Sequence, residues 1–135
     1  MVWTVPRTDV LLKVIGAPHH TELVTSVFRL AEALLDRGAT VQVWTCAEAT
    51  GLTRAGLGDS KPPDLTDWTV DYPSTARLVR ELLAGAPDRI SWYVCRFCCV
   101  DRGAAEQIPE VRVRPPARFW EHVLAADKTL VLGVC

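Results

Sequence analysis

The sequence has no excess of charge of either sign and no long hydrophobic run. Its 135 residues include 15 Lys and Arg against 16 Asp and Glu, which gives a formal net charge of −1 at pH 7. A chain without a global positive field is expected neither to bind nucleic acid directly nor to attach to a membrane surface. Its apolar stretches are too short to span a bilayer, and residues 1–16, which contain Arg7, Asp9 and Lys13, do not read as a secretory signal.

The sequence also lacks internal repeats and low-complexity segments. A chain of this length is expected to form one domain, covering residues 1–135, and 49% apolar with 23% charged residues is typical of a soluble globular protein. Five cysteines without an export signal indicate a reducing, cytoplasmic setting. In that setting clustered cysteines are more often catalytic or metal-binding than disulfide-bonded.

Short apolar runs alternate with amphipathic segments, which predicts an α/β protein. The runs predict strands at residues 10–15, 40–44, 90–95, 110–114 and 128–134, and the amphipathic segments predict helices after Thr21, after Ser74 and over residues 117–126, with a short helical turn near residues 98–102. We expect a three-layer sandwich with a five-stranded, mainly parallel sheet in the flavodoxin-like order 2-1-3-4-5. Residues 51–73 are rich in Gly and Pro, and predict a lid, a partner-binding loop or a partly disordered segment.

The first candidate site follows from that strand order. Ligands of such sheets bind at the carboxyl ends of the strands, here in the crevice between the first and third strands. This would bring His19 and His20 close to Cys95, with Arg96 and Arg102 nearby. Positive charge and amide dipoles would lower the pKa of Cys95 and make it a nucleophile, whereas the alternative is a buried, inert thiol. The two histidines would orient a substrate or assist proton transfer, or simply cap the loop.

The stretch "WYVCRFCCVDRG" leaves other cysteine chemistries open. Cys95 and Cys98 form a C-x-x-C pair, which suits thiol–disulfide exchange. A structural zinc site needs four ligands, so zinc would require convergence with other cysteines or with the histidines of the first loop. Cys99 is expected to pack inside the protein, Cys46 to lie away from the crevice, and Cys135 to be an exposed terminal thiol.

Three segments together resemble the DsrE/DsrF-like sulfurtransferases, which include TusD-like proteins. The segment "VFRLAEALLDRGATVQVW" is similar to a helix and strand of that family, and "FWEHVLAADKTLVLG" is similar to its final helix and strand. Between them, "VCRFCCVDRGA" matches the family's strand, cysteine and Arg-Gly pattern at Cys95, Arg102 and Gly103. The chain departs from the TusD-like pattern at "RFCC" and "CAEA", so transfer of sulfur to tRNA is not implied.

The resemblance implies an enzyme, a cytoplasmic sulfurtransferase in which Cys95 accepts a sulfane sulfur as a persulfide and passes it on. Arg96 or Arg102 would stabilise the persulfide. Cys98 and Cys99 are additional to the family pattern, and either would be able to attack the Cys95 persulfide, releasing sulfide and leaving a disulfide. The implied partners are a sulfur donor of the cysteine desulfurase or rhodanese type, an acceptor protein or thiol, and further subunits in a trimer or hexamer. No cofactor or metal is required. The alternatives are a non-catalytic subunit of a sulfur-transfer complex and a small C-x-x-C redox or metal-binding protein.

Overall fold

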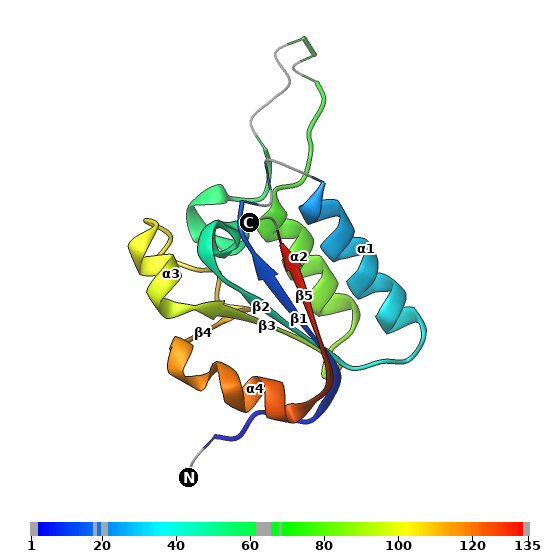
Figure 1. Ribbon diagram of the computed structural model, residues 1–135. Coiled ribbons are helices and arrows are strands. Elements are labelled where there is room, and N and C mark those ends of the chain that lie inside the picture. Colours follow the sequence, from blue (N-terminus) through cyan, green and yellow to red (C-terminus); the bar gives the residue numbers. More distant parts are fainter. Residues whose placement is uncertain (1–2, 18, 20–21, 62–65, 68, 134–135) are drawn as a thin grey trace.

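The computed structural model describes residues 3–17, 19, 22–61, 66–67 and 69–133, which form a five-stranded sheet with helices on both faces (Figure 1). The strands are β1 (Thr8–Ile15), β2 (Val41–Thr45), β3 (Ile90–Cys95), β4 (Arg112–Arg114) and β5 (Ala126–Gly133). Every neighbouring pair is parallel. The expected α/β sandwich is therefore confirmed.

The strand order is β4-β3-β2-β1-β5, so the expectation of a flavodoxin-like order is wrong. β1 pairs with β2 on one side and with β5 on the other, and β2 pairs in turn with β3. The chain thus adds three strands in one direction before it returns to the free side of β1. The apolar pattern of a buried strand shows that both its faces are covered, but it does not specify which strand lies beside it.

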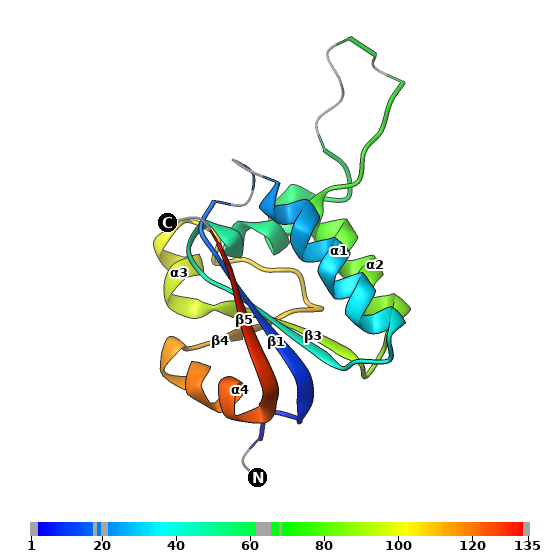
Figure 2. The same ribbon diagram turned by 45° about the vertical axis from the view of Figure 1, so that its right-hand side comes forward.

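The connections between strands produce the layers. α1 (Leu23–Asp36) and α2 (Thr75–Gly85) both cover one face, because right-handed crossovers that step in the same direction stay on the same face (Figures 1 and 2). α4 (Phe119–Ala125), preceded by the 3-10 turn η4 (Pro116–Arg118), leads back to β5 and covers the opposite face. α3 (Arg96–Asp101) follows β3 directly and lies at the carboxyl end of the sheet.

The two faces have different cores. Between the sheet and the α1–α2 layer the buried side chains are mainly aliphatic, and include Val10, Leu12, Val14, Val27, Ala31, Val41, Val43, Val79 and Val94. Beneath α4 the buried group consists of Leu11, Trp44, Tyr93 and Cys95. Period-2 alternation along β1 explains the division, because Leu11 and Leu12 point to opposite faces.

The helix starts show which capping signals operate. Ser74 caps α2, since its hydroxyl accepts a hydrogen bond from the Arg77 amide at 3.1 Å. Thr21, the expected cap of the first helix, lies outside the described residues.

None of the helices in the described ranges combines the length and the apolar character that crossing a bilayer requires.

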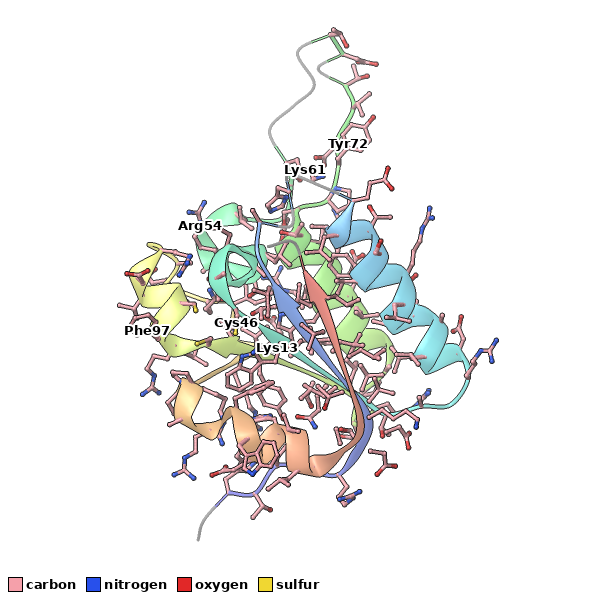
Figure 3. The ribbon with its side chains drawn as sticks, viewed as in Figure 1. Lys13, Cys46, Arg54, Lys61, Tyr72 and Phe97 are labelled. Carbon is pink, nitrogen blue, oxygen red and sulfur yellow. The ribbon has the colours of Figure 1, made fainter. Side chains whose placement is uncertain are left out.

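The segment expected to be irregular, residues 51–73, includes regular structure. The end of the 3-10 helix η2 (Ala47–Thr53) and all of η3 (Ala55–Leu57) lie within it. Beyond them the chain projects from the body near Lys61 and Tyr72 (Figure 3), where the Lys61 amide donates to the Tyr72 carbonyl at 2.8 Å. The projection is therefore closed at its base by backbone pairing.

Candidate functional site: a cluster of three cysteines

Three cysteines converge at the carboxyl edge of the sheet. The Sγ atoms of Cys46, Cys95 and Cys98 all lie within 4.8 Å of one another. Cys46 follows β2, Cys95 ends β3, and Cys98 lies in the first turn of α3. We call these three residues the cysteine cluster.

The strand order explains why Cys46 belongs to the cluster. β2 and β3 are parallel neighbours with Thr45 opposite Val94, so the next residues, Cys46 and Cys95, leave the sheet side by side. The expectation that Cys46 lies away from the site is therefore wrong. It rested on a flavodoxin-like order, in which β1 separates β2 from β3. The sequence did carry a signal, since each of the two cysteines stands at the carboxyl end of an apolar strand.

Cys95 is buried, with 2% of its surface exposed. Burial raises the pKa of its thiol to about 11, an effect that the backbone amide of Cys98 opposes only in part. The neighbouring sulfurs of Cys98 and Cys46 raise this pKa further, and neither Arg96 nor Arg102 is among the groups that act most strongly on it. The expectation of an accessible thiol with a lowered pKa at this position is wrong for the single chain.

Cys46 is half-buried and has polar neighbours. The indole Nε1–H of Trp44 donates a hydrogen bond to its Sγ at 3.0 Å. Burial raises the pKa of Cys46, while the Trp44 bond and the positive charge of Lys13 lower it in part. Lys13 comes from β1 opposite Trp44, its ammonium lies 4.4 Å from the centre of the Phe119 ring, and Figure 3 shows it next to Cys46.

Lys13 is a site residue that our sequence analysis missed. The available signal was a single lysine inside the apolar run "VLLKVI". A charged group on a strand covered on both faces is costly unless a partner or a function accounts for it. The structure places this charge where it favours thiolate over thiol at Cys46.

Cys98 and Cys99 are neighbours in sequence but face different surroundings. Cys98 is half-buried and packs with the group beneath α4, whereas Cys99 is buried in the aliphatic core on the other face. The expectation that Cys99 is packed inside the protein is confirmed. Cys135 lies outside the described residues.

Arg102 and His19 line a pocket of about 540 Å³ with Glu48 and Arg54. The Arg102 guanidinium is paired with Glu48 at 2.9 Å and with Asp101 at 3.3 Å. The structure therefore brings His19 and Arg102 together, but the cluster cysteines are not among the lining residues. β2 occupies the position between β1 and β3 where the crevice was expected. His20 lies outside the described residues.

Arg96 points to a different surface. It borders a shallow hollow of about 470 Å³ together with Phe97, Val100, Asp101 and Pro116. Phe97 and Val100 are 66% and 61% exposed, and Figure 3 shows Phe97 pointing away from α3 into solvent. An apolar patch thus lies on the same short helix as Cys98.

Beneath α4 a buried polar network lies in the same layer as the cluster. His122 is fully buried, and its Nδ1 lies 2.9 Å from Gln42 Oε1. The Arg114 Nε–H donates to His122 Nε2 at 3.4 Å. Because a guanidinium only donates, Nε2 carries the lone pair and Nδ1 the proton. Burial, and then the Arg114 charge, lowers the pKa of His122 to about 4, so the ring is neutral at pH 7.

Comparison with known proteins supports the fold. The chain is similar to the solved structure of the YchN protein from E. coli, with a TM-score of 0.70 and 20% sequence identity, covering 92% of this chain and 98% of that one. YchN has the DsrE-like fold, so the fold implied by the resemblance is confirmed. No protein-family model matches the chain, and no curated protein matches it in sequence.

Proposed function

We propose that the protein is a persulfide carrier that relays sulfane sulfur through its cysteine cluster. The observation that carries the proposal is the convergence of the three Sγ atoms of Cys46, Cys95 and Cys98 within 4.8 Å. A DsrE-like fold is compatible with this activity. Three thiols at such separations suit the exchange of a sulfur atom between neighbours.

Sulfur enters the cluster at Cys98. This residue is half-buried, whereas Cys95 is covered and protonated at neutral pH. The Cys98 thiolate attacks the outer sulfur of a donor persulfide, the sulfur–sulfur bond of the donor breaks, and the donor leaves as a thiolate. Cys98 then carries the persulfide.

The sulfur is then held at Cys95. Its sulfur attacks the outer sulfur of the Cys98 persulfide, and the Cys95 proton passes to Cys98, which becomes a thiol again. With 2% exposure, Cys95 protects the bound sulfur from reductants in solution. A persulfide is more acidic than a thiol, and the Lys13 charge and the Trp44 N–H beside Cys46 favour an anion in the cluster. Delivery to the acceptor reverses the two steps.

The neighbouring residues have supporting roles in this scheme. Arg102 is a positioning residue, because its ion pair with Glu48 ties the end of α3 to η2, which begins just after Cys46. The donor and acceptor proteins dock on the patch of Phe97 and Val100, next to the entry cysteine. His19 and Arg96 contact the bound partner from the two flanking hollows. Assembly into oligomers and a cytoplasmic location belong to the same proposal.

The test is anaerobic sulfur loading by a cysteine desulfurase with cysteine, followed by mass spectrometry with site mapping. Wild type gains sulfur on Cys98 and Cys95. Cys98→Ser loads at least about 10-fold less, because the entry thiol is missing, and Cys95→Ser loads but loses its sulfur faster. Cys99→Ser is the matched control, because this cysteine faces the aliphatic core, and it loads like wild type.

A second candidate is a non-catalytic subunit of a sulfur-transfer complex. The burial and raised pKa of Cys95 favour it, since that residue matches the family's reactive cysteine. This candidate predicts no loading in wild type and a stable complex with related chains. Equal loading of wild type, Cys95→Ser and Cys98→Ser would contradict the persulfide route through the cluster.

A further inference from the structure

The cysteine cluster has the composition and spacing of a site for a soft metal ion. We propose that the thiolates of Cys46, Cys95 and Cys98 bind one Cu(I) ion in a three-coordinate site. This goes beyond sulfur relay and does not depend on it, because it requires only the convergence of the three Sγ atoms.

The separations suit a three-coordinate ion. Metal–thiolate bonds are about 2.3 Å long, so three sulfurs around one ion lie about 4 Å from one another. The Sγ atoms of the metal-free protein lie within 4.8 Å. Small rotations of the half-buried Cys46 and Cys98 side chains toward the fixed, buried Cys95 close the difference.

The ligand set favours copper over zinc. Soft thiolates bind both Cu(I) and zinc, but a structural zinc ion takes four protein ligands, so the number of ligands decides between the two. Within the described part of the chain, the group of converging Cys, His, Asp and Glu side chains contains three sulfurs and no fourth member. Burial of Cys95 beside Leu11 and Tyr93 closes that side of the site to water as a fourth ligand.

The surroundings offset the charge of the complex. Three thiolates and one monovalent ion carry a net charge of −2, and binding three thiols releases three protons. The Lys13 ammonium acts on this site, and the Trp44 N–H already donates to Cys46 Sγ. Because protons must leave, copper affinity falls as the pH is lowered.

The experiment is an anaerobic Cu(I) titration of the full chain against a competing chelator, bathocuproine disulfonate. We expect one equivalent of copper, a thiolate-to-copper absorption band and a change in tryptophan fluorescence, because Trp44 contacts Cys46. Cys46→Ser and Cys98→Ser, both at half-buried positions, weaken binding by about 100-fold or more, since a lost ligand costs at least as much as a lost outer-shell partner. Cys99→Ser, whose side chain lies in the other core, binds like wild type.

The outcomes separate this proposal from sulfur relay. Loss of copper binding in Cys99→Ser equal to that in Cys98→Ser, or unchanged binding in Cys46→Ser and Cys98→Ser, overturns it. Tighter binding of zinc than of copper under the same competition also overturns it. Copper binding without sulfur loading supports the metal site and overturns the relay. Sulfur loading without copper binding supports the relay and overturns the metal site.

Discussion

The two faces of the sheet differ in chemistry although the same strands build both. The face beneath α1 and α2 is mainly aliphatic, with Trp92 as its one fully buried aromatic side chain among the described residues, and its two helices have 14 and 11 residues. The face beneath α4, a helix of 7 residues, holds the neutral His122, the cysteine cluster and two buried aromatic rings. Titratable groups thus gather on the face with the shorter helical cover. The difference indicates that one face mainly stabilises the fold, while the other holds the thiols on which the proposed relay depends.

The largest expected effect is on stability, and it compares adjacent residues on the two faces. Leu11 and Leu12 are both fully buried, on opposite sides of β1. We expect Leu12→Ala to lower the free energy of unfolding by about 4 kcal/mol and Leu11→Ala by about 2.5 kcal/mol, because the short α4 layer collapses more readily into a cavity. Urea unfolding at pH 7 measures both, and an equal or larger loss for Leu11→Ala would contradict the comparison.

The next largest expected effect is the loss of folding stability at low pH that His122, on the α4 face, causes. The pKa of His122 is lowered in the folded state, from 6.5 to about 4. The resulting stability is present above pH 6.5 and is lost as the pH falls through 4, because the unfolded chain takes up the proton first. We expect this one group to remove about 3 kcal/mol between pH 7 and pH 4.

The variant His122→Gln isolates that contribution. Carboxylates such as Asp9 and Asp67, whose pKa values are lowered by hydrogen bonds, respond to acid equally in both proteins. Urea unfolding at pH 7 and pH 4 should therefore show a fall in stability that is smaller in the variant by about 3 kcal/mol. Identical falls would show that His122 does not remain neutral.

The third prediction distinguishes Cys95 from Cys98 within the cluster. A pKa of about 11 leaves Cys95 with about 100-fold less thiolate at pH 7 than an unshifted thiol of pKa 9.0. We expect iodoacetamide to label Cys98 before Cys95, and Cys95 at least about 100-fold more slowly than an exposed free cysteine. Peptide mapping over time measures both rates. Rapid labelling of Cys95 at pH 7 would contradict this prediction and would support the original expectation of an accessible thiol with a lowered pKa.

The smallest expected effect is the loss of stability when the residue that precedes a helix is replaced, compared between α2 on one face and α4 on the other. Ser74 caps α2, and its hydroxyl also donates to the Gly58 carbonyl at 2.7 Å. Arg118, the N-cap residue of α4, makes no side-chain cap hydrogen bond. Ser74→Ala should cost about 1 kcal/mol and Arg118→Ala less than about 0.5 kcal/mol. Thermal unfolding of both variants tests this, and equal costs would mean that the cap contributes nothing.

Much of the fold could be predicted from local pattern. All five strands and the helices after Ser74 and near residue 119 occur within a few residues of their expected places, because hydrophobic periodicity is a local property. Cys99 was expected inside, and its apolar neighbours place it there. The resemblance added the DsrE-like fold, which the YchN structure supports.

The site was harder to predict because it depends on which strands are neighbours. Cys46 was excluded and His19 included on the assumption that β1 lies beside β3. The pKa of Cys95 was assigned the wrong direction for a similar reason. Its local sequence shows two arginines, but the layer of side chains that buries it comes from β1, β2 and α4.

The order of strands and helices along the chain, and the positions of the cysteines at strand ends, are set by the sequence alone, because they follow from which residues are apolar and at what spacing. Which sulfur atoms lie close together, and whether each is exposed to solvent or buried, was decided only by the tertiary structure. Sheet order brings Cys46 to Cys95 and the packing of α4 brings His122 to Gln42, pairs that are 49 and 80 positions apart, and no local pattern specifies such pairs.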